Sequence, residues 1–212
     1  DFTWQMTPLA LVLFASLLVV CWFSFTSAPL VYQAHEKAHP WQPRLIWCSL
    51  VLYLVFLAAL EQKLALWGLG VVALGFLVMA RRVLTGIDWS LLAVFMVMFI
   101  DVHLLVSLPA LNTLLTPLSQ ASPVTLFASA VGLSQAISNV PATILLLNYV
   151  PPDRLLAWAV NIGGFGLLPG SLANLIALRM AGDRRIWWRF HLYSLPMLLW
   201  AALVGFGLFL IS

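Results

Sequence analysis

Runs of apolar residues, each long enough to cross a lipid bilayer, dominate this 212-residue chain. Hydrophobic residues make up 63% of it and charged residues 8%, whereas an average soluble domain carries about 25% charged residues. The mean hydropathy is +1.04. No water-soluble fold could bury this much apolar surface, so the sequence predicts an all-α integral membrane protein.

About six membrane spans are expected if roughly 20 apolar residues make one crossing. Their approximate ranges are 8–30, 45–60, 64–80, 89–108, 154–178 and 190–211. Thr7-Pro8 predicts the start of the first span, as a cap residue followed by Pro at the first helical position. Asp88 is available as the cap of the fourth. The polar loop 33–44, the turn Glu61-Gln62-Lys63 and the uncharged connector 109–122 separate spans.

The segment 123–150 is unlike a simple span, because Ser138-Asn139-Val140-Pro141 lies at its middle. As one kinked helix it would be about 42 Å long, too long for a hydrocarbon core of about 30 Å without strong tilt. As a re-entrant hairpin, Ser122-Pro123 would start one half-helix and the chain would turn at 138–140. A second half would then return to Pro151-Pro152.

The basic residues distinguish these two alternatives. With a hairpin at 123–150, eight of the ten Lys and Arg residues share one side of the membrane, and only Lys63 and Arg154 lie on the other. With a full span the ten divide five and five, which is no bias. The positive-inside rule therefore favours a hairpin that enters from the outer side. The cytoplasmic loops are then 33–44, 81–87 and 179–189.

The hairpin tip is the first candidate site. Non-helical backbone cannot face lipid, so a tip near the midplane must be buried in protein or line a water-filled cavity. Half-helix ends there bring dipoles and free carbonyls, and Ser138 and Asn139 add a hydroxyl and a carboxamide. These groups suit a desolvated alkali cation or an anionic part of a substrate. The alternative is that the two residues only cap a kink.

The range 154–178 carries a second interruption. Gly destabilises a helix interior by about 1 kcal/mol and Pro by about 3 kcal/mol, so the Gly and Pro residues between 163 and 170 predict a helix unwound over about 163–171. Two neighbouring interrupted segments are typical of a transporter's binding site. The alternative is a packing face with the Gly166-to-Gly170 spacing. The candidate site residues here are Asn161, Gly163, Gly164, Gly170, Ser171 and Asn174.

Two ionisable residues, Asp101 and His103, lie over halfway along the span 89–108, where such groups are costly and usually functional. Residues two apart on a helix point about 200° apart, so at most one of them can face the hairpin. Asp101 is a candidate proton-coupling carboxylate and His103 a candidate relay. A helix–helix hydrogen bond or an interfacial His is the structural alternative.

The sequence argues against an enzyme. It has no GxSxG, HExxH, CxxC or P-loop pattern, so it lacks a nucleophile, a metal set and a phosphate cradle. No cofactor is expected beyond H⁺ or Na⁺ as the coupling ion. The net charge of +3 comes from basic residues between spans, which are topology signals and do not indicate nucleic acid. Cys21 and Cys48 are expected to be small core residues.

The Ser138-Asn139 tip and the Pro-Gly-Ser-x-x-Asn break at 169–174 resemble the ion transporter superfamily. That superfamily includes the arsenite pump membrane subunit, NhaD-type sodium/proton antiporters and citrate or dicarboxylate carriers. Ser138 and Asn139 match its Ser-Asn-Thr hairpin signature, although Val140 stands where Thr would be. Gly170, Ser171 and Asn174 match its unwound segment. The resemblance implies a sodium ion at Ser138, Asn139, Gly170 and Asn174 as one occupant of the site.

The resemblance also implies an inverted repeat, each half having five spans and one hairpin, and often a homodimer with an elevator-like transport domain. Residues 1–44 would be the last span of a missing first repeat plus a cytoplasmic loop. Residues 45–212 would be the second repeat, with scaffold spans at about 45–80 and 190–211 and a transport part at about 89–178. The first repeat of the same protein and membrane lipid are thus expected partners.

The expected function is secondary active transport of a small anionic solute across the bacterial inner membrane, coupled to H⁺ or Na⁺. A cation/proton antiporter is the alternative within transport. A non-transporting membrane scaffold or partner subunit is the alternative from another class. The sequence has no arginine clamp, so it does not identify the solute.

Overall fold

The computed structural model describes residues 2–24, 42–181 and 185–211, and every regular element in these ranges is a helix. Four helices there are long and apolar enough to cross a membrane: α1, α2, α5 and α11. The predicted all-helical membrane class is confirmed. The chain divides into two compact units, Ala28–Val94 and a larger one made of Asp1–Ser27 with Phe95–Ser212.

The smaller unit is built around a pair of apolar helices, α2 (Pro43–Glu61) and α3 (Ala65–Met79), followed by the short α4 (Arg81–Thr85). The turn predicted at 61–63 lies between α2 and α3 and is confirmed, and its Lys63 has a φ of 61°. Glycines let the two helices approach closely, since a Cβ at Gly68 would lie 2.7 Å from the Ala59 Cβ. At 15 residues, α3 is about 22 Å long, shorter than the span predicted for 64–80.

The larger unit begins with α1 (Phe2–Ser24) and the second half of α5 (Trp89–Val106), which starts where predicted. The Asp88 cap is confirmed, because its Oδ1 accepts a hydrogen bond of 3.0 Å from Leu91 N. The connector 109–122 is itself helical and comprises α6 (Pro109–Leu115) and the 3₁₀ helix η1 (Thr116–Gln120). The expectation that Thr7-Pro8 starts the first helix is wrong, since Pro8 lies inside α1.

The early start of α1 has a tertiary cause. Leu9 is 2% exposed in the core, and the indole N–H of Trp158 donates to the Gln5 carbonyl at 2.9 Å. These contacts stabilise the helical turns before Pro8 and offset the hydrogen bond that Pro8 cannot make. Residues 25–30, the predicted end of this span, and most of the loop 33–44 lie outside the described residues.

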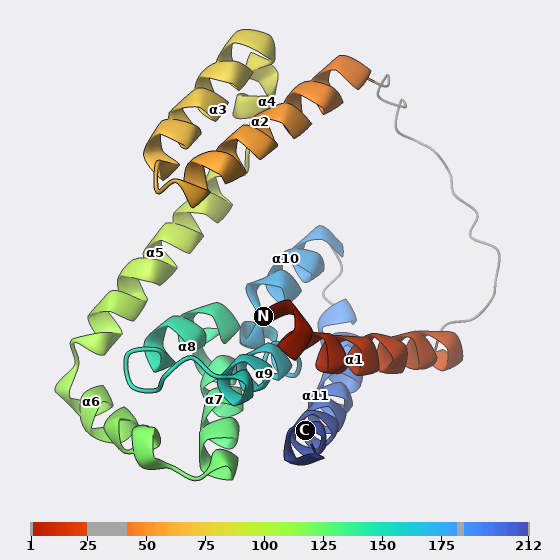
Figure 1. Ribbon diagram of the computed structural model, residues 1–212. Helices are drawn as coiled ribbons and strands as arrows, with labels where there is room; N and C mark the ends of the chain where they lie inside the picture. The colour runs from red at the N-terminus through yellow and green to blue at the C-terminus, as the bar shows by residue number, and fades with distance from the viewer. Residues whose placement is uncertain (1, 25–41, 182–184, 212) are drawn as a thin grey trace. The chain divides into compact units, whose positions relative to one another are not determined.

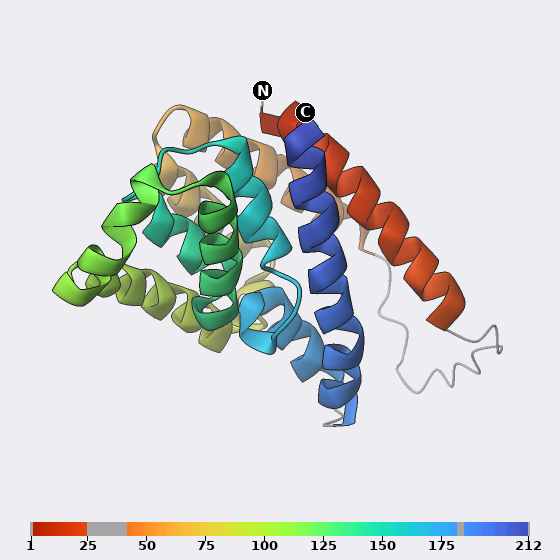
Figure 2. The same ribbon diagram turned by 90° about the horizontal axis from the view of Figure 1, so that it is seen from below.

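The rest of the larger unit contains the interrupted segments (Figures 1 and 2). Its elements are α7 (Pro123–Ile137), α8 (Asn139–Leu146), α9 (Arg154–Ile162), the 3₁₀ helix η2 (Leu168–Gly170), α10 (Leu172–Ala181) and α11 (Arg185–Ile211). Helix α11 starts several residues before the predicted 190.

The core of this unit lies where α7, α8, α9 and α11 meet. Ala130 on α7, Leu145 on α8, Ile162 on α9 and Ala201 on α11 are each 0% exposed. Helix α9 is the central element, because α7, α8, α11 and α1 all contact it. The core therefore surrounds α9, whose last residue, Ile162, directly precedes the unwound stretch.

Candidate functional site

The Ser-Asn tip forms the turn of a helical hairpin. Helix α7 starts at Pro123, where the Ser122 Oγ accepts a hydrogen bond of 3.2 Å from Thr125 N, and ends at Ile137. Helix α8 begins two residues later at Asn139 and folds back along α7. Leu146 on α8 and Gly132 on α7 accordingly line one apolar cavity of about 380 Å³. The predicted turn is confirmed, and the entry of the hairpin into a membrane from one side stays a prediction.

The backbone at the tip is strained. Ser138 has φ 76° and ψ 151°, a region occupied almost only by glycine, and a side chain there costs on the order of 1–3 kcal/mol. Its side chain is buried, at 5% exposure. Pro141 is the third residue of α8, in the first turn, where a missing N–H breaks no helical hydrogen bond. Pro141 therefore fits the start of the returning helix and does not disrupt a longer one.

The second predicted interruption is also present. Helix α9 ends at Ile162, α10 begins at Leu172, and only the short η2 interrupts the irregular chain between them (Figure 2). This matches the unwound stretch predicted at 163–171. Gly166 is essential to the path, because its φ is 95° and a Cβ there would lie 2.6 Å from Gln135 Oε1.

Three polar side chains bind the backbone that unwinding exposes. Gln135 on α7 donates from Nε2 to the carbonyls of Gly163 (2.7 Å) and Phe165 (3.0 Å) and accepts from Leu167 N (2.7 Å). Asn174 Nδ2 donates to the Gly164 carbonyl at 2.9 Å. Ser194 Oγ on α11 accepts from Gly166 N at 2.8 Å.

Sequence reasoning missed Gln135 and Ser194. A signal for Gln135 was present: it is a long carboxamide on an otherwise apolar and small-residue helix, one turn before the tip. Ser194 gave no comparable signal, since a single Ser in a spanning helix more often bonds to its own backbone.

The hairpin tip and the break meet at Gly164. A Cβ at this glycine would lie 3.3 Å from Asn139 Nδ2 and 3.8 Å from the Ser171 Cβ. The break folds tightly beside it, since a Cβ at Gly170 would lie 2.8 Å from the Gly163 carbonyl oxygen. The structure thus brings together seven of the predicted site residues: Ser138, Asn139, Gly163, Gly164, Gly170, Ser171 and Asn174.

The side chains of the other three predicted residues form no hydrogen bond with this junction among the described residues, although the Asn161 carbonyl oxygen would lie 3.1 Å from a Cβ at Gly164. Asn161 is exposed, and its Nδ2 donates to the Ala157 carbonyl of its own helix at 2.7 Å. On α5, Val102 is buried in the core at 3% exposure, and the side chains of Asp101 and His103 on either side of it are exposed. Neither side chain hydrogen-bonds to another described residue. Their roles in the site stay predictions.

Hydrogen-bond donors face the junction. Asn139 Oδ1 accepts from Val140 N at 3.0 Å, which leaves Nδ2 directed towards Gly164 with no acceptor among the described residues. The Ser171 Oγ accepts from Ala173 N at 3.3 Å, so its hydroxyl proton is available. The nearby carbonyls of the break already accept hydrogen bonds from Gln135 and Asn174. This donor set suits the oxygen atoms of an anion.

A few acceptors remain at the end of α7. Val140 N is bonded to the Asn139 side chain and Pro141 has no N–H, so the carbonyls of Ala136 and Ile137 lack the usual donor four residues on. Free carbonyls at a half-helix end are suitable ligands for a small cation. The junction therefore combines side-chain donors with backbone acceptors. Within the described ranges, no group of three His, Cys, Asp or Glu residues could hold a metal ion.

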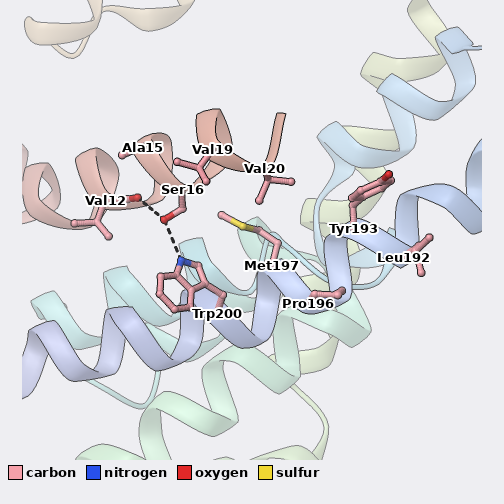
Figure 3. A pocket seen from close by; sticks show the side chains of 10 residues that line it. All are labelled: Val12, Ala15, Ser16, Val19, Val20, Leu192, Tyr193, Pro196, Met197 and Trp200. Atoms are coloured by element: carbon pink, nitrogen blue, oxygen red, sulfur yellow. Dashed lines mark hydrogen bonds between the residues drawn. The ribbon is translucent and has the colours of Figure 1, made fainter. Parts of the chain in front are cut away.

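A separate apolar cavity of about 740 Å³ opens between α1 and α11 (Figure 3), and none of the junction residues lines it. The Trp200 indole N–H donates to Ser16 Oγ at 2.9 Å, and the Ser16 hydroxyl donates to the Val12 carbonyl at 2.8 Å. Its lining contains no charged side chain. The cavity is therefore lined mainly by apolar side chains.

Comparison with known proteins assigns this architecture to a class. Residues 1–152 match the Citrate transporter family, so the chain belongs to that family of membrane transporters. The chain is 63% identical over 207 residues to the inner membrane protein YbiR of Escherichia coli strain K12, covering 98% of this chain and 56% of that protein. It is 38% identical over 111 residues to the uncharacterized transporter MJ0456 of Methanocaldococcus jannaschii, covering 52% of this chain and 30% of that protein.

The chain thus spans about half the length, or less, of these curated relatives. No solved structure matches it. The transporter family and the relative named as a transporter support the expectation that the chain is not part of an enzyme.

Proposed function

We propose that the chain is part of a secondary active transporter of the bacterial inner membrane that moves a small anionic solute, driven by a H⁺ or Na⁺ gradient. The family and the relative named as an inner membrane protein support the class and the location. The observation that carries the choice of solute is the donor pair at the junction, Asn139 Nδ2 and the Ser171 hydroxyl, beside carbonyls that already accept hydrogen bonds.

In this proposal Ser138, Asn139, Gly163, Gly164, Gly170, Ser171 and Asn174 form one half of the site, and Asn161 lies at its edge. A matching first repeat of the same protein would supply the other half, and a homodimer is the proposed assembly. The hairpin tip would contribute donors and the broken helix a backbone cradle, so solute binding would depend on their alignment.

The direct test is uptake by everted and right-side-out vesicles, using radiolabelled phosphate, sulfate and citrate as probe anions. Asn139→Ala removes a donor, and Asn174→Ala leaves the Gly164 carbonyl unbonded. Each is expected to lower transport of the accepted anion by about tenfold or more. The matched control is Asn148→Ala, because the Asn148 Nδ2 is exposed and bonds only to backbone of its own turn. Transport unchanged in both site variants would contradict the site.

Cation/proton antiport is the second candidate, favoured by the free carbonyls of Ala136 and Ile137. In this alternative, sodium would bind at Ser138, Asn139, Gly170 and Asn174, although Val140 replaces the Thr of the family signature. Sodium-dependent pH changes in everted vesicles, without anion uptake, would establish this alternative. A non-transporting scaffold would show neither response in any variant.

We assign the coupling proton to Asp101, with His103 as its relay, from their position over halfway along α5. Asp101→Asn cannot exchange a proton. It is therefore expected to abolish uptake driven by a pH gradient while leaving counterflow of preloaded anion within about twofold of the parent. His103→Gln should slow the driven uptake without abolishing it. Driven uptake that survives Asp101→Asn intact would remove this residue from the mechanism.

A further inference from the structure

Gln135 is the one side chain of the hairpin arm α7 that binds the unwound segment at three points. Its Nε2 donates to the Gly163 and Phe165 carbonyls at 2.7 and 3.0 Å, and its Oε1 accepts from Leu167 N at 2.7 Å. These partners lie 28 to 32 residues away in the chain. Both ends of the carboxamide are used, so its orientation is fixed as well as its position.

The surrounding atoms are fitted to this carboxamide. A Cβ at Gly166 would lie 2.6 Å from Gln135 Oε1, and a Cβ at Gly170 would lie 3.3 Å from Gln135 Nε2. Two glycines of the break therefore leave the space that the Gln135 side chain fills. Helix α7 also contacts the break closely at Ser134, one residue before Gln135, because a Cβ at Gly163 would lie 2.5 Å from the Ser134 Cβ.

Without Gln135 the exposed backbone would be left unsatisfied. The carbonyls of Gly163, Gly164 and Phe165 accept no hydrogen bond from a backbone N–H of the described residues, and an unpaired N–H or C=O away from water costs several kcal/mol in a membrane. Gln135 satisfies two of these carbonyls and one N–H, and Asn174 and Ser194 satisfy one further group each. The break would otherwise have to shift to find other donors.

We propose that Gln135 is a positioning residue that locks the broken helix to the hairpin arm, so that Asn139 and Ser171 face the same solute and the two segments move as one body. Gln135 itself need not touch the solute, because its polar atoms are already bonded. The effect of Gln135 on solute binding rests on the proposed transport function. The lock, meaning the attachment of the break to α7, rests on the hydrogen bonds alone.

The kinetic test compares Gln135→Met and Gln135→Glu with the control Gln120→Met, in which an exposed Gln at the end of η1 is replaced. Met has a similar length but no hydrogen bonds, and ionised Glu keeps the acceptor while losing both donors. Both are expected to raise the KM of the transported anion (phosphate, sulfate or citrate) by about tenfold or more, with a smaller fall in maximal rate. An unchanged KM in both variants would overturn the role in positioning the site.

A labelling test measures the lock without any transport. Leu168 in η2 is buried, at 9% exposure, so Leu168→Cys, in a background with Cys21→Ala and Cys48→Ala, should react slowly with a maleimide. Adding Gln135→Met should accelerate labelling by about fivefold or more, because the break opens more often, whereas Gln120→Met should not. If Gln135→Met does not accumulate in the membrane, Gln135→Glu gives the same comparison.

The two tests separate the possible failures. If the parent protein moves no probe anion and no sodium, the transport proposal fails, and the labelling rate alone decides whether Gln135 holds the break. If the parent transports but the Gln135 variants show parental KM and parental labelling, the lock is wrong and the transport proposal stands.

Discussion

At the scale of single residues, two backbone conformations fix the candidate site. Ser138 and Gly166 both have positive φ, at 76° and 95°, one at the hairpin tip and one in the break. Ser138 carries the strain of a side chain in a glycine region, and strain of this kind concentrates at functional sites. Gly166 avoids the strain by having no side chain. The site therefore depends on a glycine at position 166 and on a tolerated backbone strain at Ser138.

We expect Gly166→Ala to destabilise the protein by about 1–3 kcal/mol, because Ala disfavours this φ and its Cβ would overlap Gln135 and Leu198. Gly132→Ala on α7 is the matched control, since a Cβ there meets nothing within 4 Å. That control should be neutral or stabilise by up to about 1 kcal/mol. The measurement is the thermal unfolding midpoint of the protein in detergent. Equal midpoints for the two variants would contradict the described path of the break.

How far single residues could be predicted depended on their chemistry. Polar residues next to a helix breaker, such as Asn139 and Asn174, were recognisable because both are unusual in an apolar span. Gln135 was missed, because its partners are backbone groups about 30 residues away, and no local pattern shows such a pairing. The apolar surroundings of Asp101 gave a functional hypothesis, but spacing could not place it against the junction.

At the scale of elements, the interruptions were more predictable than the helix lengths. The break at 163–171 follows from the local energetics of Gly and Pro, because five such residues between 163 and 170 all disfavour a helix interior. The short α3 and the helical connector α6 were not foreseen, because apolar content does not determine where a helix ends. The early start of α1 depends on the burial of its Leu9 in the core and on the hydrogen bond from Trp158 to its Gln5 carbonyl, which only the folded chain supplies.

The re-entrant hairpin makes a prediction about sidedness. In the Cys21→Ala, Cys48→Ala background, Gln120→Cys and Pro152→Cys flank the hairpin at exposed positions, and Met180→Cys lies in the last turn of α10. An impermeant maleimide should label the first two from the outer face and the third from the cytoplasmic face, as the positive-inside rule requires. Labelling of Gln120→Cys and Pro152→Cys from opposite faces would mean that 123–150 crosses the membrane.

At the scale of the whole molecule, the chain belongs to the Citrate transporter family and covers 56% of the length of its Escherichia coli relative. An inverted repeat would add a second hairpin and a second broken helix to the junction described here. In the proposed function, solute binds where the Asn139 tip meets the Gly164 break. Transport rates depend on many steps besides solute binding, whereas occupancy of the junction reports binding alone.

The most direct measurement is solute protection of Ser171→Cys from a small membrane-permeant thiol reagent, in the background without native cysteines. Saturating transported anion (phosphate, sulfate or citrate) is expected to slow labelling by about fivefold or more, because the bound anion would cover this position. Thr113→Cys on the exposed side of α6 should label at the same rate with and without anion. A labelling rate at Ser171→Cys that no transported solute changes, while transport itself continues, would contradict the assignment of the site to this junction.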